Sequence, residues 1–430
     1  MLKSYRRLFE ALTRFHDEGL PISHIHRGLS SEGVDIFDGS LKVKHRDRAS
    51  FLSTSYDPLL ETVTERLLDR LEDCKRKFPR VAVLGGAGEH VINQLRGGRA
   101  GVKTVTVIDS SQCMLQRLKD FSLKGPAARS SVSQAAAIIS DQASSVSEQE
   151  TSRNADPSSS SSSSDRNHLL GREGNLPDLE FKLMEGELLP VEPESFDLVI
   201  SSLGLHWYND LPAMIAQCRF ALKPDGLLLA ALLGGDTLQE LRISCSVAQM
   251  EVLGGVSSVV SPLAQHRSVA ETEALGGVLS VVSPLAQVRD AGNLLTRAGM
   301  AMPTVDLDSF KLFYACPTDV IKHLRVMGES NAVIHRQRYM PRDVALATAA
   351  VYKAMFEEDG AYPATFQVMY MTGWAPHESQ QQPLERGSAT LSFQELAAGL
   401  VVQGAVGGAA EEKEELQDSK LDNEHPHGPS

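Results

Sequence analysis

The sequence predicts an α/β fold: one twisted, mainly parallel sheet of seven strands with helices on both faces. Short apolar runs at residues 81–84, 196–200 and 227–233 are typical of strands buried on both faces of a parallel sheet. Segments with apolar residues at helical spacing alternate with these runs, as they do in βαβ crossovers. In such sheets ligands bind beyond the carboxyl ends of the strands, so we expect the functional residues there.

The first half of the chain is expected to supply one leading helix and three strands. Asp57 followed by Pro58 predicts a helix start, because aspartate caps the first turn and proline suits its first position. Apolar residues then recur at helical spacing until Phe78-Pro79 stops the helix. The elements expected next are a strand at 81–84, a short helix at 89–96, a strand at 103–108 and a third strand near 181–184.

The second half is expected to complete the sheet. A strand at 196–200, a helix at 211–222 and a strand at 227–233 form one crossover, with Pro224-Asp225-Gly226 as a turn. The remaining expected elements are helices from Thr237 and at 291–298, 318–327 and 343–356, and strands near 305–313 and 365–372.

Residues 34–123 and 176–396 are expected to form a single domain. The serine-rich residues 124–175 cannot bury enough apolar area to offset their ordering entropy, so a disordered insertion is expected there. The acidic tail, residues 401–430, is expected to be disordered as well. Residues 251–287 contain one segment twice with few differences, which indicates a tandem duplication or a faulty gene model and not a repeat fold.

Composition excludes several functional classes. The formal net charge of -13 argues against nucleic acid as the main partner, because phosphate binding needs a basic surface. The five cysteines contain no CxxC pair, so we expect neither a zinc site nor a disulfide framework. No apolar run approaches the roughly 20 residues that a membrane-spanning helix needs. Residues 1–33 begin with a basic amphipathic stretch, which is typical both of a mitochondrial targeting segment and of an ordinary surface helix.

A glycine-rich turn after the first strand holds the first candidate binding residues, Gly85, Gly86 and Gly88. Glycines let the backbone approach a ligand closely, and the helix that follows offers free N–H groups. Asp109, at the end of the next strand, is placed to bind ribose hydroxyls. The pattern predicts a nucleoside-containing cofactor, although glycines also end strands for purely steric reasons.

Further candidates follow the third, fourth and fifth strands. Glu185, with Gly186 beside it, can accept from an adenine amino group or can be an ordinary turn acid. His206 can take a proton from an acceptor, or it can fill space with Trp207 between the sheet and a covering segment. Asp236 can bind a cationic substrate or cap the helix that follows it.

Several motifs resemble those of class I S-adenosylmethionine-dependent methyltransferases of the type-11 group. SFDLVISSLGLHWYNDLP at 195–212 and LKPDG at 222–226 match that family. LRVMGESNA at 324–332 and PATFQVMYMTGWAP at 363–376 are more similar to one branch, the mitochondrial complex I (NADH:ubiquinone oxidoreductase) assembly factors of arginine-hydroxylase type. The resemblance covers roughly residues 34–396, without the serine-rich segment and one copy of the duplication.

The resemblance implies a Rossmann-like seven-stranded methyltransferase sheet and S-adenosylmethionine as the cofactor. It also implies a location on the matrix side of the mitochondrion, a complex I subunit as protein substrate, and at most peripheral association with the inner membrane. The cofactor-binding residues that it implies are Gly85, Gly86, Gly88, Asp109, Ser111, Met114, Glu185 and Gly186.

The chain departs from the family's cofactor loop at three positions. Val83 stands where a carboxylate is expected, and Ala87 and Glu89 stand where glycines are expected. Three functions therefore remain open: an enzyme that modifies a protein arginine, an assembly chaperone on a decayed enzyme fold, and a carrier-protein or small-molecule methyltransferase. No spacing resembles the ligand set of a non-haem iron enzyme, so hydroxylation is implied by the resemblance alone.

Overall fold

The structure is a computed structural model that describes residues 35–53, 56–123, 175–252, 288–334 and 340–380. The elements below belong to the first of its two units, Met1–His377. The segments expected outside the domain lie outside the described residues as well: 1–33 and 401–430 wholly, and 124–175 and 251–287 nearly so.

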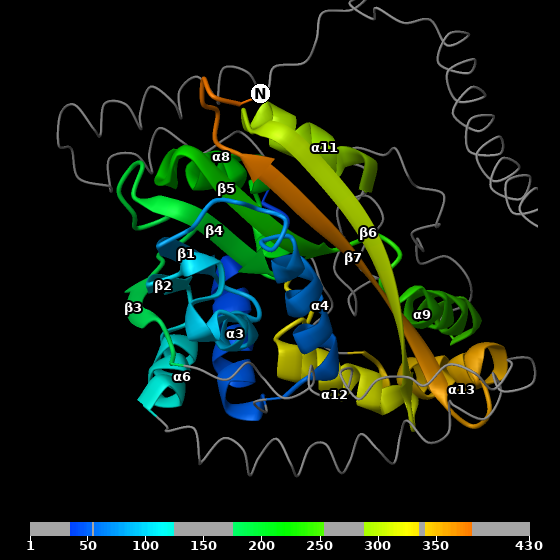
Figure 1. The fold of residues 1–430 in the computed structure, drawn as a ribbon. Helices are drawn as coiled ribbons and strands as arrows, with labels where there is room; N and C mark the ends of the chain where they lie inside the picture. Colours follow the sequence, from blue (N-terminus) through cyan, green and yellow to red (C-terminus); the bar gives the residue numbers. More distant parts are fainter. Residues whose placement is uncertain (1–34, 54–55, 124–174, 253–287, 335–339, 381–430) are drawn as a thin grey trace, which may run out of the picture. The chain divides into compact units, whose positions relative to one another are not determined.

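The described part of the chain forms the expected seven-stranded sheet, in the order β3-β2-β1-β4-β5-β7-β6 (Figure 1). Strands β1 to β5 pair in parallel, whereas β7 runs antiparallel to both of its neighbours, β5 and β6. The prediction of a mainly parallel α/β sheet is confirmed. The strands are β1 (Arg80–Leu84), β2 (Thr104–Asp109), β3 (Asp178–Leu183), β4 (Phe196–Ser202), β5 (Leu222–Leu233), β6 (Ala301–Tyr314) and β7 (Tyr362–Trp374).

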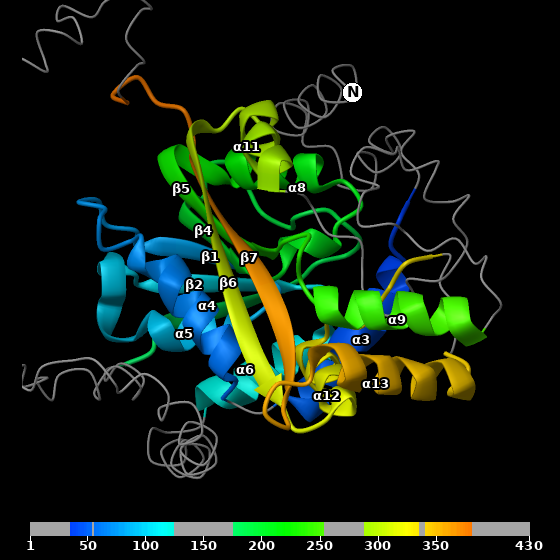
Figure 2. The same cartoon turned by 90° about the vertical axis from the view of Figure 1, so that its right-hand side faces the viewer.

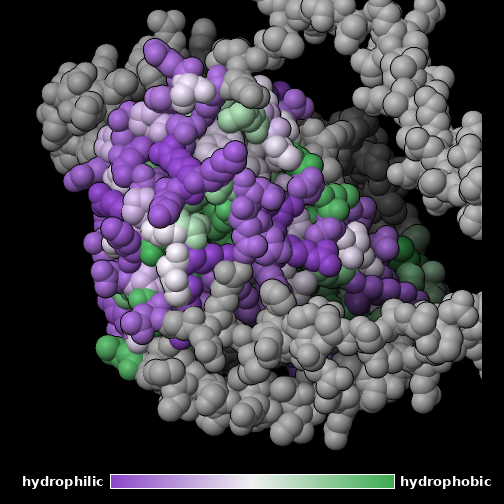
Figure 3. Space-filling model, in the orientation of Figure 1, coloured by the Kyte–Doolittle hydropathy of each residue, from purple (hydrophilic) through white to green (hydrophobic). Residues whose placement is uncertain are grey.

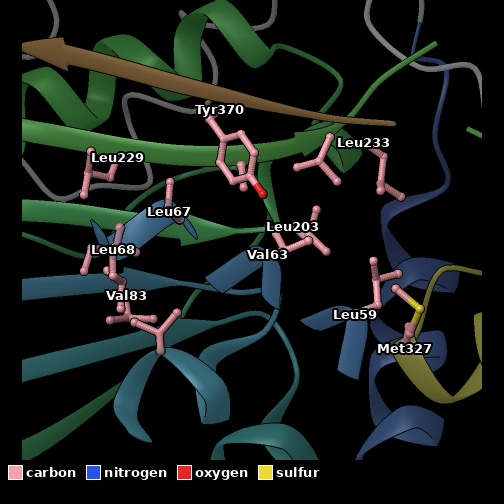
Figure 4. Packing of buried hydrophobic residues seen from close by; sticks show 14 of the residues in the cluster. Leu59, Val63, Leu67, Leu68, Val83, Leu203, Leu229, Leu233, Met327 and Tyr370 are labelled. Carbon is pink, nitrogen blue, oxygen red and sulfur yellow. The ribbon is translucent and has the colours of Figure 1, made fainter. Parts of the chain in front are cut away.

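Helices pack on both faces of the sheet because side chains alternate along each strand. Val81 and Val83 of β1 belong to one buried cluster, with α4, α5 and α6, whereas Ala82 and Leu84 belong to a second cluster, with α8 and α11. Figure 4 shows α4 side chains meeting residues of β1, β5 and β7 in the first cluster. The helices are α3 (Gly39–Leu52), α4 (Pro58–Asp69), α5 (Gly88–Gln94), α6 (Gln112–Leu123), α8 (Leu211–Ala221), α9 (Gln239–Val252), α11 (Val288–Arg297), α12 (Pro317–Met327) and α13 (Arg342–Phe356).

The apolar side chains are collected mainly between these layers. The face of the molecule in Figure 3 is covered mostly by hydrophilic residues, with separate hydrophobic patches. Helices α9 and α13 lie side by side, as Figure 2 shows, and pack against the sheet near β7.

Helix α3 was not expected from the sequence, and its composition explains why. Its buried residues are His45, Arg46, Ala49 and Ser50, so its inner face is mainly polar and has no apolar periodicity. The helix begins after Asp38, whose carboxylate accepts from the Leu41 N–H at 3.0 Å. Helix α6 was likewise not expected, and α4 ends at Asp69, well before Phe78-Pro79.

Two local expectations at the start and the end of β5 are wrong. Pro224-Asp225-Gly226 is not a turn outside the strand but an outward bulge within β5, with Asp225 at a φ of 62°. An Arg76 guanidinium donates to the Asp225 carbonyl and stabilises this backbone. The following helix begins at Gln239 and not at Thr237, because the Thr237 hydroxyl donates to the carbonyl of Gln367 on β7.

The two adjacent glycines of the turn after β1 have different steric environments. Both have positive φ, 49° at Gly85 and 57° at Gly86. A Cβ added at Gly86 would overlap the carbonyl oxygen of Ser202 at the end of β4, whereas one added at Gly85 would meet nothing within 4 Å. Gly86 is therefore required by the packing of the sheet itself, and Gly85 faces open space.

We expect Gly86→Ala to destabilise the protein by more than about 3 kcal/mol, because strain and steric overlap act together. Gly85→Ala is the matched control and should cost only about 1–2 kcal/mol, because the added methyl group strains the left-handed backbone but meets no neighbouring atom. Urea unfolding followed by circular dichroism measures both. Equal losses for the two variants would contradict the steric argument.

Candidate functional site

Helix α3 brings two basic residues to the carboxyl ends of the parallel strands. Lys42 and Arg46 lie one helical turn apart, so their side chains share one face of α3. In Figure 1 the helix lies beside α6 and α12, with which it makes contact. The chain entering α3 is held by Asn209, whose side-chain oxygen accepts from the Ile36 and Phe37 N–H groups at 2.8 Å each.

Arg46 forms a buried ion pair with Asp109, the last residue of β2. The guanidinium also donates to the carbonyl oxygen of Gly86 at 3.1 Å, so that α3 is bound to two strand ends at once. Burial alone would lower the pKa of Arg46, but the Asp109 carboxylate outweighs burial and raises it above its ordinary value. We call Arg46, Asp47, Gly86, Asp109 and Ser111 the Asp109 cluster.

The other oxygen of Asp109 orders the start of α6. It accepts from the Ser111 N–H at 2.8 Å, and the Ser111 hydroxyl in turn accepts from the Met114 N–H at 3.0 Å. The same hydroxyl donates to the Asp47 carboxylate on α3. The structure therefore brings Gly86, Asp109 and Ser111 together, while Met114 is a buried core residue of α6.

These residues fit a nucleoside cofactor at two points. Gly85 faces open space beside the turn, and the Asp109 carboxylate lies at the strand end where ribose hydroxyls are bound in folds of this class. Arg46 now shares that carboxylate, so a ribose has to displace the guanidinium or share the oxygens with it. Gly88 is not sterically required, because a Cβ there would make only ordinary contacts.

Two residues that depart from the family's loop, Val83 and Glu89, are accommodated by packing and by an ion pair. Val83 points into the core shown in Figure 4, where a carboxylate would be desolvated. Glu89, on the first turn of α5, is buried and pairs with Arg117 of α6 at 3.1 Å. Its second oxygen, Oε1, is buried and has no hydrogen-bond partner among the described residues.

Glu185 and Gly186 lie beside the Asp109 cluster but are exposed. The Met184 N–H donates to the Asp109 carbonyl at 3.0 Å, which places the segment next to the end of β2. The neighbouring Glu187 has a structural role instead: its carboxylate accepts from the Asn209 N–H at 2.7 Å and orders the loop after β4.

A second buried group, the Glu329 cluster, consists of Lys42, His206, Trp207, Gly328 and Glu329. One carboxylate oxygen of Glu329, Oε2, lies 2.8 Å from His206 Nε2 and accepts from the indole N–H of Trp207 at 2.8 Å. Lys42 donates to the carbonyl of Gly328 at 2.7 Å and lies 3.5 Å from Glu329 Oε1. Gly328 ends α12 in a left-handed conformation, φ 79°, which turns Glu329 toward α3.

Charge in the Glu329 cluster is set by burial and by these pairings. Burial opposes ionisation of Glu329, but Lys42 and His206 outweigh it and hold the pKa of Glu329 at about 2. An ionised carboxylate at His206 Nε2 favours the tautomer with the proton on that nitrogen. The Nδ1 atom of His206 is then an acceptor, and it is buried without a hydrogen-bond partner among the described residues. A carboxylate-oriented imidazole with a free acceptor nitrogen is the arrangement of a general base.

The interpretations of Trp207 and Asp236 have different outcomes. Trp207 is buried and packs edge-on against Phe37 at a centroid distance of 5.2 Å. Asp236 is exposed and does not cap the next helix; its carboxylate accepts from the Gln367 amide at 2.8 Å. No contact joins Asp236 to either cluster within the part of the chain that the structure describes.

Residues 35–53, 56–123, 175–252, 288–334 and 340–380 contain no group of three or more His, Cys, Asp or Glu side chains arranged to hold a metal ion. None of the helices described in these ranges is both long and apolar enough to cross a membrane.

Sequence reasoning missed Lys42 and Glu329 as site residues. Glu329 lies inside the motif at 324–332, but it is 287 positions from Lys42 in the sequence, and only the fold brings the two residues together. The sequence signal that could have indicated this site is the pair of basic residues Lys42 and Arg46, which are spaced by one helical turn in a segment without apolar periodicity.

The Glu329 carboxylate should make the free energy of unfolding depend on pH in the acidic range. Its pKa is lowered from 4.5 to about 2, so its contribution is complete above pH 4.5 and is lost as the pH falls toward 2. Unfolding free energies from about pH 5 to about pH 2 should fall by about 3 kcal/mol more for wild type than for Glu329→Gln. Glu358→Gln, at an exposed carboxylate, is the control. Parallel wild-type and Glu329→Gln curves would show that the carboxylate is not held ionised.

Comparison with known proteins extends this description. The family model described as methyltransferase domain matches residues 132–230. The mitochondrial arginine-hydroxylase NDUFAF5 of Danio rerio is 35% identical over 380 residues, which is 87% of this chain and 94% of the relative. Its Homo sapiens counterpart is 34% identical over 388 residues, 88% of this chain and 90% of the relative. A malonyl-acyl-carrier-protein O-methyltransferase of Halorhodospira halophila is 31% identical over 205 residues, 47% of this chain and 60% of the relative.

The matched domain confirms the expected methyltransferase fold class, and the names of the relatives confirm the expected mitochondrial localisation. The two NDUFAF5 relatives align with this chain over 94% and 90% of their own lengths. The chain therefore belongs to the family of the mitochondrial arginine-hydroxylases NDUFAF5.

Proposed function

We propose that this protein binds S-adenosylmethionine at the Asp109 cluster and modifies an arginine side chain of a complex I subunit on the matrix side of the mitochondrion. The cofactor follows from the methyltransferase domain and from the carboxylate at the end of β2. The arginine follows from the name of the relatives. The complex I subunit follows from the resemblance to the assembly-factor branch.

The observation that carries the proposal is that two buried carboxylates, Asp109 and Glu329, both lie against helix α3. Asp109 lies at the end of β2, where it would bind the sugar of the cofactor, and Glu329 lies close enough to act electrostatically on both Lys42 and Arg46. A cofactor site and a substrate site have to be neighbours, because group transfer depends on holding the two reactants in contact. The Asp109 and Glu329 clusters supply such neighbours.

When bound, S-adenosylmethionine would supply an electrophilic methyl group on a sulfonium. Within the chain, Asp109 would hold the ribose and Gly85 would leave room beside the turn. His206 would accept a proton at Nδ1, and Glu329 would orient the imidazole and stabilise its charged form. The segment around η3 (Leu205–Trp207) is buried, which strengthens these electrostatic interactions by excluding water.

Two observations favour a second function, an assembly chaperone that binds a complex I subunit without catalysis. Arg46 already neutralises the carboxylate on which cofactor binding depends. Val83 also removes the carboxylate that the family usually places in the loop.

Calorimetric titration with S-adenosylmethionine separates the two functions. The enzyme predicts saturable binding on the order of micromolar, and Asp109→Asn should weaken it at least about tenfold by removing the ribose acceptor. Asp236→Asn, at an exposed carboxylate after β5, is the matched control and should leave the affinity unchanged. The absence of heat at millimolar ligand, with folded protein verified by circular dichroism, would favour the chaperone.

His206 should be needed for modification but not for cofactor binding. His206→Gln removes the acceptor nitrogen, so we expect at least about a hundredfold loss of modified arginine with the calorimetric affinity preserved. Mass spectrometry of complex I subunits, from cells carrying wild-type or variant protein, measures the modification and distinguishes an added methyl group from an added oxygen. Full modification by His206→Gln would remove His206 from the mechanism.

A further inference from the structure

The Lys42 ammonium lies among groups that together are typical of a cation-binding site. It is 3.6 Å from the centroid of the Trp207 ring, donates to the Gly328 carbonyl at 2.7 Å, and lies 3.5 Å from Glu329 Oε1. An aromatic face, a carbonyl oxygen and a carboxylate are the three kinds of group that stabilise a desolvated cation. All of them are supplied by segments outside α3.

Lys42 fits this site imperfectly. Glu329 Oε2 accepts at 2.8 Å from Trp207 and pairs with His206 at 2.8 Å, whereas among the described residues Oε1 has only the long contact to Lys42. Burial lowers the pKa of Lys42 to about 7 despite the attraction of Glu329, so the ammonium is incompletely compensated. A guanidinium is less strongly hydrated, stacks on indole and presents several donors in one plane, and it therefore suits these groups better.

The position of the site relates it to the rest of the chemistry. His206 pairs with the same carboxylate through Nε2, and its Nδ1 atom is buried without a hydrogen-bond partner in the described ranges. Lys42 and Arg46 share one face of α3, so movement of α3 that withdraws Lys42 from Glu329 also withdraws Arg46 from Asp109. Because both side chains belong to α3, a movement of this helix would remove Lys42 from the Glu329 cluster and Arg46 from the Asp109 cluster together.

We propose that Trp207, Glu329 and the Gly328 carbonyl form the receptor for the guanidinium of the protein substrate, and that Lys42 occupies this receptor as an internal surrogate in the free protein. The identification of the ligand as an arginine side chain rests on the proposed function. The substrate guanidinium replaces the ammonium above the indole ring and pairs with Glu329 Oε1. The contrasting reading is a purely structural ion pair, in which Lys42 never leaves.

Lysine footprinting of the wild-type protein tests the exchange directly. N-acetyl-arginine amide is the probe, and N-acetyl-citrulline amide is its uncharged analogue. Acetic anhydride labelling read by mass spectrometry should show at least about a threefold rise at Lys42 with the arginine probe and no change with the citrulline analogue. Lys311, an exposed lysine paired with Glu358, is the internal reference. Unchanged protection of Lys42 at saturating probe would overturn the proposal.

A matched pair of variants tests the surrogate role. The chain has two tryptophans, so Trp207 fluorescence can be followed alone in a Trp374→Phe background. Lys42→Met empties the receptor and should tighten binding of the arginine probe at least about tenfold. Lys42→Arg keeps a cation in place and should bind the probe no better than wild type. Equal affinities for Lys42→Met and wild type would contradict the proposal. If Lys42→Met does not fold, the acetic anhydride labelling of the wild-type protein tests the proposal without it.

Calorimetry with S-adenosylmethionine on the same samples separates this inference from the proposed function. Guanidinium binding that displaces Lys42, without cofactor binding, would support the receptor and remove the methyl-transfer function. Cofactor binding with Lys42 protected at saturating arginine probe would support the cofactor site and overturn the receptor.

Discussion

The buried ion pair between Arg46 and Asp109 is the interaction on which the site depends. It joins α3 to the end of β2, and the same guanidinium reaches the Gly86 carbonyl after β1. A lone charge in such surroundings would be costly, so the pair holds α3 against the end of β2. The Asp109 carboxylate, which we propose to hold the ribose of the cofactor, is thus oriented by Arg46 and buried beneath α3.

The Glu329 cluster repeats this arrangement one helical turn away. Lys42 faces a buried carboxylate, an indole ring and a carbonyl, and His206 is oriented by the same carboxylate. In each cluster a basic residue of α3 faces an acid, which is supplied by the end of β2 in one case and by the residue after the cap of α12 in the other. A ligand that satisfies one acid weakens the hold of α3 on both, so cofactor and substrate are expected to assist each other's binding.

The sheet could be predicted from the sequence because its central strands are buried on both faces and read as apolar runs. The same argument located Asp109 and His206 at strand ends. It could not find α3, whose inner face is polar, nor the partnership of Lys42 with Glu329, which depends on the far end of α12. Asp236 was misread because the Gln367 side chain, from β7, takes its carboxylate. The glycines show the same limit: Gly86 satisfies both a binding motif and a steric need of the sheet, and only its contact with β4 tells the two apart.

A crystal structure of the protein with S-adenosylhomocysteine tests the central claim most directly. The account predicts the ribose hydroxyls within hydrogen-bond distance of the Asp109 carboxylate, with the Arg46 guanidinium moved from its bridge between Asp109 and Gly86. A nucleoside bound elsewhere, or one bound beside an unchanged Arg46–Asp109–Gly86 bridge, would contradict it.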